Sequence, residues 1–449
     1  SSSGIYGLNN TEISNTGTIT TGGSSTGIFY SDIEKDSAGN VTAINNTTTG
    51  LKNDGTINLN GDDSVALTYE PGNITSTVAF ENTGDISSTG DKNVGMYAKL
   101  AKNNAAYTTK NTGNITLGNS ASLSNPNVAM YTNATSTGTN PLINVGTGNI
   151  TVGDNAVGMY GYEENSNGNI TVGNGSIAMY SKGGNVNVAG SITTGNSGES
   201  VGVYTVGNGQ TITNNGTVFN LGDTSFGFVN VGSGNNITSN GGSATLSNNG
   251  VFIYSSDKAN TINNSTNISS TGSIGKNYGI YASGTVNNSG NMNLSNGVGN
   301  LGIYITNGGT GRNSGNITVG ASDDPNGFYS IGMAAGYVGD STNPATTGTI
   351  ENDGTITVTG EKGIGMYGAN TGTTVTNNNN IVLNANNTMG IYVENGAKAV
   401  NNGSIRTGVS GLSSVIGVVL GQNSILENNG TINISGTQSK GVLLKGGTI

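Results

Sequence analysis

The sequence predicts an all-β protein, a right-handed parallel β-helix (a solenoid) of about 17 coils with three short strands per coil. Three observations carry this prediction: a four-residue box that recurs along the chain, a second strand pattern that follows an Asn-x-Gly corner, and a composition poor in both apolar and charged residues.

The box has the pattern apolar–Gly–apolar–Tyr, as in Val94–Tyr97 (VGMY) and Ile364–Tyr367 (IGMY). It recurs 17 times with a mean period of about 27 residues; position two is Gly in 13 copies, and position four is Tyr in 11. Successive side chains of a strand point to opposite faces. We therefore expect positions one and three to face the core, and positions two and four to face outward.

A second strand follows an Asn-x-Gly corner in most units, as in NDGTINL from Asn53 and NDGTITV from Asn352. Asn and Gly tolerate positive φ, which a tight corner would require. A third, weaker strand precedes the corner, as at Thr374–Thr376. All five prolines lie outside the predicted strands, where their missing amide donor breaks no hydrogen bond between strands. All eight methionines are expected to point inward.

The amino-acid composition excludes several classes of function. Hydrophobic residues make up 32% and charged residues 9% of the 449 residues, against roughly 45–50% and roughly 25% in ordinary domains. A net charge of −10 with 15 Lys and Arg residues opposes a phosphate-binding surface, so we expect no nucleic-acid partner. The absence of Cys and His excludes disulfides, thiolate nucleophiles and imidazole ligands.

A single coil buries too little apolar surface to offset the entropy of ordering its residues. We therefore expect residues 1–449 to form one continuous β-helix, about 80 Å long at about 4.8 Å per coil, and to be a segment of a longer chain. Insertions near residues 31–50, 99–110, 321–330 and 337–348 interrupt the repeat. Extra residues at solenoid corners become loops, often on the binding face; neutral drift in tolerant corners is the alternative.

Two groups of residues are candidates for ligand binding. Tyrosines at position four would stack into an outward ladder that suits sugar rings or protein partners, although such a ladder can also simply pack along the sheet. The insertions supply charged and aromatic side chains. The candidates are Tyr97, Tyr131, Tyr160, Tyr180 and Tyr204 in the ladder, and Asp32, Lys35, Asp323, Asp324, Phe328 and Tyr329 in the insertions.

No catalytic, cofactor or metal site is predicted. The string GNSGES at Gly195–Ser200 resembles a serine nucleophile turn but lacks a histidine base. Asp323 and Asp324 lack the spaced acidic ligands of a calcium loop. Polysaccharide lyases and hydrolases need clustered carboxylates, whereas the 25 acidic residues here are spread among the corners.

The repeated NDGTITV…GIGMYG and NNGTINI…GVLL units resemble the passenger domains of type V autotransporters. They look most like the very large fusobacterial outer-membrane adhesins of the RadD-like type. The resemblance implies a surface-exposed β-helical passenger, monomeric and not itself in the membrane, anchored to the outer membrane by a C-terminal β-barrel absent from this sequence. It also implies adhesion to other bacteria or to host-cell receptors or glycans, and hence roles in coaggregation and virulence.

Three functions are therefore open. The leading hypothesis is an adhesin passenger that attaches the cell to bacterial or host surfaces. The alternatives are a passive β-helical stalk that displays a binding site elsewhere, and a β-helical glycan-active enzyme. Binding of the isolated chain to cells distinguishes the first from the second.

Overall fold

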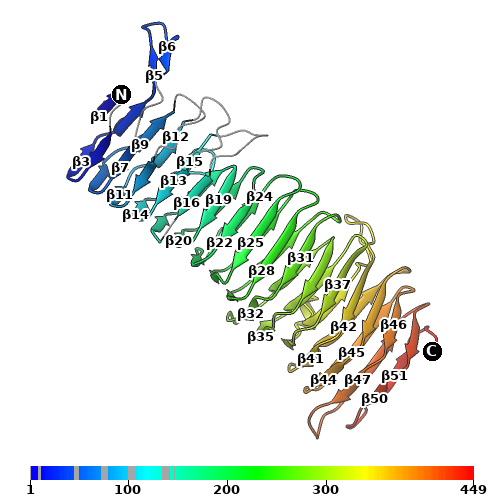
Figure 1. Cartoon of the computed structure of the whole chain (residues 1–449). Helices are drawn as coiled ribbons and strands as arrows, with labels where there is room; N and C mark the ends of the chain where they lie inside the picture. The colour runs from blue at the N-terminus through cyan, green and yellow to red at the C-terminus, as the bar shows by residue number, and fades with distance from the viewer. Residues whose placement is uncertain are drawn as a thin grey trace. The chain divides into compact units, whose positions relative to one another are not determined.

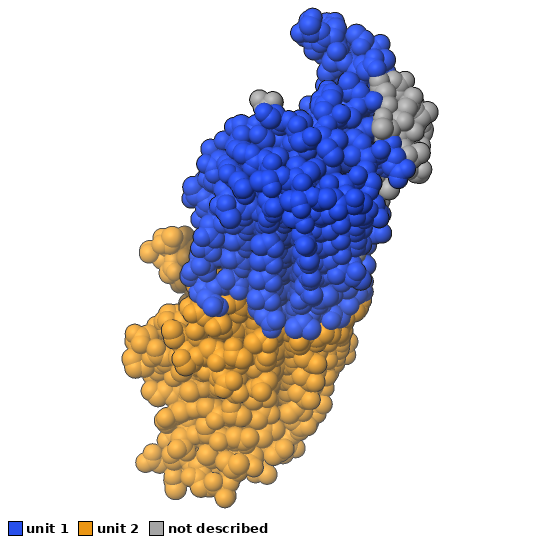
Figure 2. Space-filling view, turned by 90° about the vertical axis from the view of Figure 1, so that its left-hand side faces the viewer, with its two compact units in different colours: residues 1–220 blue, residues 221–449 orange. Residues whose placement is uncertain are grey.

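A computed structural model describes residues 2–8, 12–44, 50–71, 79–99, 108–133, 142–145 and 147–449. The chain divides into two compact units, residues 1–220 (unit 1) and 221–449 (unit 2), which Figure 2 distinguishes by colour. Within each unit, strands from successive turns stack in parallel, as the labelled ribbons of Figure 1 show.

Each turn of unit 1 contributes one strand to each of three parallel sheets. The first sheet, which contains the boxes, has strands β1 (Ser3–Leu8), β4 (Thr26–Ser31), β9 (Val65–Glu70), β12 (Val94–Ala98), β15 (Val128–Thr132), β18 (Val157–Gly161), β21 (Ile177–Ser181) and β24 (Val201–Thr205). The second sheet, before the corners, has β2 (Ile13–Asn15), β7 (Gly50–Asn53), β10 (Ala79–Asn82), β13 (Thr108–Asn111), β16 (Leu142–Val145), β19 (Glu163–Ser166), β22 (Val186–Val188) and β25 (Thr211–Asn215). The third sheet, after the corners, has β3 (Thr18–Thr21), β8 (Thr56–Leu59), β11 (Asp85–Ser88), β14 (Asn114–Leu117), β17 (Asn149–Val152), β20 (Asn169–Val172), β23 (Ser191–Thr193) and β26 (Val218–Leu221).

Unit 2 repeats the arrangement. Its first sheet has β27 (Phe226–Asn230), β30 (Val251–Ser255), β33 (Tyr278–Ala282), β36 (Leu301–Ile305), β39 (Ile331–Ala335), β42 (Ile364–Ala369), β45 (Met389–Glu394), β48 (Ile416–Leu420) and β51 (Lys440–Leu444). Its second has β28 (Asn236–Asn240), β31 (Thr261–Asn264), β34 (Thr285–Asn288), β37 (Gly309–Asn313), β40 (Gly348–Asn352), β43 (Thr374–Asn377), β46 (Lys398–Asn401) and β49 (Ile425–Asn428). Its third has β29 (Ser243–Leu246), β32 (Asn267–Ser270), β35 (Met292–Val298), β38 (Ile317–Ala321), β41 (Thr355–Val358), β44 (Asn380–Leu383), β47 (Ser404–Thr407) and β50 (Thr431–Asn433).

This architecture confirms the predicted parallel β-helix with three strands per turn. The second and third sheets have 16 strands each in the part of the chain that is described, which gives about 16 turns. That residues 1–449 form one continuous domain stays a prediction. In the described residues no helix is long and apolar enough to cross a membrane.

The side-chain directions of the box are only half as predicted. Position three is buried, as at Met96 and Met366, and position four faces outward, half-buried, as at Tyr97 and Tyr367. Position two, however, lies in the core: a Cβ added at Gly365 would point at the Gly390 carbonyl and at an isoleucine of the third sheet. The prediction that this glycine faces outward is wrong.

Position one, predicted to point into the core, instead lies on the outer face beside position four, although many of its residues, such as Ile331 and Ile364, are buried there as predicted. Ile331 and Ile364 cluster there with Ala334, and Leu301 and Tyr304 pack against them. The backbone explains this change, because the register of neighbouring boxes pairs positions one, three and four and skips position two. Strict alternation therefore breaks between positions two and three, which both turn inward. We call the outward residues of positions one and four the outer stripe.

The methionine prediction has one exception for the same reason. Met389 occupies position one of its box and packs on the outer stripe, whereas the other seven methionines are buried. The prolines agree with the prediction where they are described, since Pro71, Pro126, Pro325 and Pro344 lie outside the strands; Pro141 lies outside the described residues.

The Asn-x-Gly corners exist, but the predicted positive φ is wrong for most of them; Gly216, in the corner Asn214–Gly216, has a φ of 79°. Asn352 and Gly354 are absent from the residues with positive φ. The asparagine side chains instead form a buried ladder: the Asn313 amide donates to Asn352 Oδ1 at 3.0 Å, and the Asn352 amide donates to Asn377 Oδ1 at 3.0 Å. Each amide also donates to the glycine carbonyl two residues on, as Asn352 does to Gly354 at 2.9 Å. The ladder thus gives the buried asparagine side chains of the corners hydrogen-bond partners in the neighbouring turns.

The insertions form loops outside the regular turns. Residues 33–44 make an antiparallel hairpin of β5 (Ile33–Lys35) and β6 (Val41–Ile44), which projects from its neighbours in Figure 1. Residues 45–49 and most of the insertion at 99–110 lie outside the described residues. The insertion at 321–330 contains a short 3-10 helix, η1 (Asp324–Asn326). The insertion at 337–348 is closed by an antiparallel bridge between Tyr337 and Thr346.

One buried carboxyl group interrupts the apolar interior of unit 1. Glu164 on β19 is 1% exposed and pairs in register with Val186 of the next turn. Neither carboxyl oxygen has a hydrogen-bond partner with good geometry among the described residues. Burial raises the pKa of Glu164 well above its usual range, and the Gly161 backbone opposes this only in part. The folded state therefore favours protonated Glu164.

Glu164→Val is expected to stabilise the protein, and by more at pH 8 than at pH 4. Because the folded pKa is raised, stability is highest below the unfolded pKa and falls as pH rises toward the folded pKa. Removing an unpaired buried polar group returns on the order of 2 kcal/mol at pH 8. Urea unfolding midpoints at both pH values measure the gain, and Glu164→Gln, which cannot ionise, serves as the control. An equal gain at both pH values would contradict the buried protonated carboxyl.

Candidate functional site

The predicted tyrosine ladder of unit 1 is present on the outer face of the first sheet. Consecutive rings lie at centroid distances of 5.1 Å (Tyr97–Tyr131), 5.2 Å (Tyr131–Tyr160), 4.9 Å (Tyr160–Tyr180) and 5.1 Å (Tyr180–Tyr204). Interplanar angles of 27° to 40° show that neighbouring rings cover much of each other's faces. The ladder therefore offers ring edges and hydroxyl groups outward, rather than the open faces that sugar stacking needs.

A groove of about 490 Å³ runs beside this ladder. Position-one aliphatic residues form its floor with the tyrosines, and the segment before β15 forms its wall. Its lining comprises Val94, Leu123, Ser124, Pro126, Val128, Tyr131, Val157, Tyr160, Ile177 and Tyr180. The ladder therefore lies next to an aliphatic column and not, as expected, next to a bare glycine strip. That these tyrosines bind a ligand stays a prediction.

The two hairpin candidates lie at the base of the hairpin and not at its tip. Asp32 is 0% exposed and accepts a hydrogen bond from the Tyr69 hydroxyl at 2.8 Å. The Lys35 ammonium lies 2.7 Å from Glu70 Oε1, and the Lys99 ammonium lies 3.4 Å from the same atom. Asp32 is therefore placed as a buried structural residue, while Lys35 lines a shallow groove beside it.

The candidates of the insertion at 321–330 are held by local contacts. The Tyr329 hydroxyl donates to Asp324 Oδ1 at 2.6 Å, and the Lys362 ammonium lies 3.3 Å from Asp324 Oδ2. The two contacts lower the pKa of Asp324, the Tyr329 bond contributing more. Asp323 Oδ2 accepts a bond from the Asn326 amide at 2.7 Å. Among the described residues, no three acidic side chains gather into a metal site.

The aromatic residues of that insertion remain open to solvent. Phe328 is 38% exposed, and its ring carries the Lys276 ammonium at 3.7 Å from the centroid. Tyr329 is 39% exposed. The cation–π contact ties the insertion to the corner before β33 (Tyr278–Ala282). Phe328 and Tyr329 thus keep the exposure that a contact residue needs.

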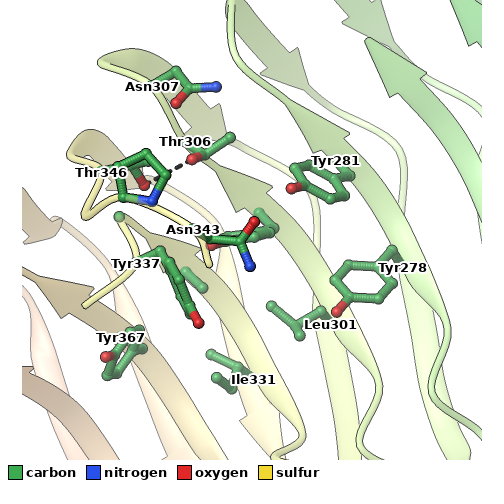
Figure 3. A pocket seen from close by; sticks show the side chains of 14 residues that line it. Tyr278, Tyr281, Leu301, Thr306, Asn307, Ile331, Tyr337, Asn343, Thr346 and Tyr367 are labelled. Atoms are coloured by element: carbon green, nitrogen blue, oxygen red, sulfur yellow. Dashed lines mark hydrogen bonds between the residues drawn. The ribbon is translucent and has the colours of Figure 1, made fainter. Parts of the chain in front are cut away.

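A larger groove lies on the outer stripe of unit 2, with a volume of about 530 Å³ (Figure 3). Strands β33, β36, β39 and β42 supply its floor and the insertion at 337–348 supplies its wall. The lining comprises Tyr278, Tyr281, Leu301, Tyr304, Thr306, Asn307, Ile331, Ala334, Gly336, Tyr337, Asn343, Pro344, Thr346 and Tyr367. In Figure 3 the labelled tyrosines and Asn343 surround the apolar floor of Leu301 and Ile331.

The lining of this groove is uncharged. It contains tyrosine, aliphatic, asparagine and threonine side chains and no Asp, Glu, Lys or Arg. Burial raises the pKa of Tyr304, and burial together with the bond to Glu394 raises the pKa of Tyr367. Both phenols therefore stay protonated near neutral pH and act as hydrogen-bond donors. Glu394 is engaged by the Tyr367 and Tyr392 hydroxyls at 2.7 and 2.9 Å.

Sequence reasoning found the parts of this groove but did not join them. The insertion at 337–348 was identified, and Tyr278, Tyr281, Tyr304 and Tyr367 occupy recognised box positions. The missing signal was the fourth position of the box Ile331–Ala334 (IGMA), where alanine replaces tyrosine between two insertions. A gap in the ladder beside an inserted loop marks a hollow on the surface.

The comparison with known proteins agrees with the fold. A family model described as the BigA third pectate lyase-like domain matches residues 165–404, more than half of the 449 residues. No curated protein and no solved structure matches the chain. Pectate lyase-like domains are β-helices, in keeping with the three parallel sheets described above. The chain therefore belongs to the family of the BigA third pectate lyase-like domain.

Proposed function

We propose that this chain is part of a surface-exposed autotransporter adhesin passenger, which attaches the cell to other bacteria or to host cells. Membership of the BigA family supports an adhesin-type β-helix. The repeat style favours the fusobacterial outer-membrane type. In this proposal the β-helix displays a binding surface at a distance from the cell body and acts as a monomer.

The observation that carries the proposal is the groove on the outer stripe of unit 2. Its volume of about 530 Å³ lies within the range of roughly 300–1,000 Å³ that ligand sites occupy. Tyrosine and aliphatic side chains give it apolar area, while Asn307, Asn343 and the tyrosine hydroxyls offer polar contacts. Such a surface suits recognition of a glycan or of a protein receptor.

We further propose that the groove binds without turnover. Glycan cleavage by a β-helix requires an acid and a base at the reacting bond, and the lining of the groove has no carboxylate or amine side chain. Incubation with host and bacterial polysaccharides, followed by assays for reducing ends and for the absorbance of unsaturated products, tests this. Product formation would make the chain a glycan-active enzyme instead.

Shortening the insertion at 337–348 is expected to reduce binding of the purified chain to target cells at least fivefold. Tyr337 and Thr346 pair through two backbone hydrogen bonds of 3.2 and 2.9 Å, so residues 338–345 can be replaced by Asn-Gly, a two-residue hairpin turn. The change removes Asn343 and Pro344 from the groove wall and leaves every turn of the β-helix in place. Flow cytometry with labelled protein measures the binding.

The matched control shortens the hairpin of unit 1 by replacing residues 37–39, which lie at its exposed tip. Removing all of residues 31–50 is a poorer test, because Ser31, Asp32 and Ile33 are buried and their loss would destabilise the fold. Equal binding by both shortened variants would place the binding surface elsewhere. A complete absence of cell binding by the intact chain would favour the passive stalk.

A further inference from the structure

One cation lies on the tyrosine ladder of unit 1. Lys182 directly follows β21, and its ammonium lies 4.6 Å from the centroid of the Tyr160 ring, in a cation–π contact. Burial lowers the pKa of Lys182, but interactions with the side chains of Tyr160, Tyr131 and Tyr180 outweigh burial, so that the pKa is raised. Lys182 is therefore charged at neutral pH, beside a groove whose lining has no charged side chain.

Lys182 differs from the other lysines of unit 1 in having no counterion. The five others that the structure describes each pair with a carboxylate: Lys35, Lys52, Lys92, Lys99 and Lys110. Lys182 forms no ion pair among the described residues, which include all 25 Asp and Glu residues of the chain. An unpaired ammonium next to an apolar groove attracts an anionic group of a ligand.

The groove and the ammonium lie on opposite sides of the tyrosine column. Along the chain, Ile177 begins β21, Tyr180 follows within the strand, and Lys182 comes just after it. Ile177 lines the groove of about 490 Å³ together with Tyr160 and Tyr180, whereas Lys182 is not part of this lining. A ligand that reaches both the groove and Lys182 therefore crosses the edge of the ladder.

The tyrosine hydroxyls supply polar contacts between these two ends. Burial raises the pKa of Tyr131 and of Tyr180, so both phenols are protonated at neutral pH and can donate hydrogen bonds. Because the stacked rings present their edges outward, the ladder contacts a ligand through hydroxyl groups and not through open ring faces. Oxygen atoms of a sugar ring and its substituents are suitable acceptors for these groups.

The charge of the site selects the class of sugar. One ammonium suits a ligand with one negative charge, whereas a polyanion such as a sulfated polysaccharide needs a cluster of cations. The aliphatic side chain of Ile177, which is only half-buried, suits a methyl group. Sialic acids combine both features, because the carboxylate and the acetamido group lie on opposite sides of the pyranose ring.

A peptide fits this surface less well. A peptide that binds a sheet commonly adds to an unpaired strand edge, but β18 and β21 are each paired on both sides. A fatty acid would pair its carboxylate with Lys182 and leave the tyrosine hydroxyls without acceptors. An acidic sugar satisfies the cation, the hydroxyls and the aliphatic floor together.

We propose that unit 1 binds a terminal sialic acid across the tyrosine ladder, with the carboxylate on Lys182 and the acetamido methyl group in the groove beside Ile177. The ladder hydroxyls donate to the sugar oxygens between these two contacts. This site uses no residue of the groove of unit 2. It goes beyond the proposed function by adding a charged ligand, which the uncharged lining of that groove does not suit.

Lys182→Met tests the contact with the carboxylate, because methionine keeps an unbranched side chain beside Tyr160 and removes the charge. The matched control is Lys258→Met, which removes an exposed lysine outside both grooves. The probes are immobilised sialyllactose, its methyl ester, lactose, and a counterpart of sialyllactose in which a hydroxyl group replaces the acetamido group. Biolayer interferometry with the full chain measures the dissociation constants.

Lys182→Met is expected to weaken binding to sialyllactose at least tenfold, since a charge-assisted contact is lost, while Lys258→Met binds as the parent does. The parent is expected to show a similar loss with the methyl ester and no measurable binding to lactose. The counterpart without the acetamido group is expected to bind several-fold more weakly than sialyllactose. If Lys182→Met lowers the melting temperature, Tyr180→Phe, which keeps the ring and removes one donor, must also weaken binding.

Two results would overturn the site: equal binding of sialyllactose and its methyl ester by the parent, or unchanged sialyllactose binding by a folded Lys182→Met protein. Equal binding of the counterpart without the acetamido group would overturn the contact in the groove. A parent chain that binds cells but no sialylated probe would overturn the site and leave adhesion standing. Binding of sialyllactose by a chain that binds no cells would support the site and contradict the proposed function.

Discussion

Replacing Gly354 by alanine is expected to destabilise unit 2 by about 3 kcal/mol or more. Gly354 ends an Asn-x-Gly corner, and a Cβ there would lie less than 3.0 Å from the Gly315 carbonyl of the preceding turn. That carbonyl cannot retreat freely, because it accepts a hydrogen bond of 2.8 Å from the buried Asn313 amide. The added methyl group therefore forces apart two stacked turns.

The matched control is Gly441→Ala, whose added Cβ would meet its nearest atom, a methyl group of Ile432, at 3.8 Å. Thermal unfolding and amide hydrogen exchange of β40 and β41 measure the effect, since a solenoid can open locally before it unfolds as a whole. Equal melting temperatures and exchange rates for the two variants would show that the stacked corner tolerates a side chain.

The corner shows what periodicity predicts well and what it misses. The spacing of Asn352, Gly354 and Ile356 located the corner and the strand after it, because a repeated polar–Gly–apolar pattern has few structural solutions. The reason first given for the glycine, a positive φ, was wrong. Glycine is required at this position because the preceding turn approaches it closely, and its φ is not positive. That close approach depends on residues of another repeat.

The side-chain directions of the box were predicted wrongly for a related reason. Alternation is a property of a regular strand, and the register of the boxes skips position two. Gly95 and Met96 both turn into the core, which moves position-one residues such as Val94 to the surface. The near-exclusive use of Gly and Ala at position two was the available signal, since an exposed position would accept larger polar residues.

The outer stripe results from this change in side-chain direction, and it makes the floor of the candidate site apolar. Aliphatic residues at position one and tyrosines at position four lie side by side, so the surface of the first sheet is apolar over many turns. Asp32 could not be placed from sequence, because its burial depends on Tyr69 of a later turn. The groove of unit 2 depends in the same way on how one loop folds over four neighbouring strands.

The buried asparagine ladder leads to the second large effect. Asn401 is 0% exposed, accepts a hydrogen bond from the Asn377 amide at 2.9 Å and donates to Asn428 Oδ1 at 2.7 Å. Asn401→Ala leaves the buried Asn377 amide without its acceptor, whereas the exposed Asn428 can turn to water. The substitution is expected to cost about 2 kcal/mol, since an unpaired buried group costs roughly 1–3 kcal/mol. The loss is read from the urea midpoint and from exchange protection of β46 and β49.

The neighbouring residue provides the control, because Asn402 makes the same kind of amide ladder on the exposed side of the corner. Its amide donates to Asn378 Oδ1 at 2.9 Å, and it accepts from Asn429 at 3.0 Å. Water replaces these partners, so Asn402→Ala is expected to change stability by no more than about 0.5 kcal/mol. Similar losses for the two variants would mean that burial of the ladder contributes nothing.

Asn401→Asp separates the hydrogen bonds from the packing. The side chain keeps nearly the same shape, but an ionised carboxylate cannot donate to Asn428 and places a charge in a buried column. Its pKa in the folded state is therefore raised, so the destabilisation is fully present at neutral pH and shrinks as pH falls toward the unfolded pKa. A protonated carboxyl donates again, so Asn401→Asp recovers stability relative to the parent at pH 4, whereas Asn401→Ala does not. Failure of this recovery would show that the asparagine column acts through its shape alone.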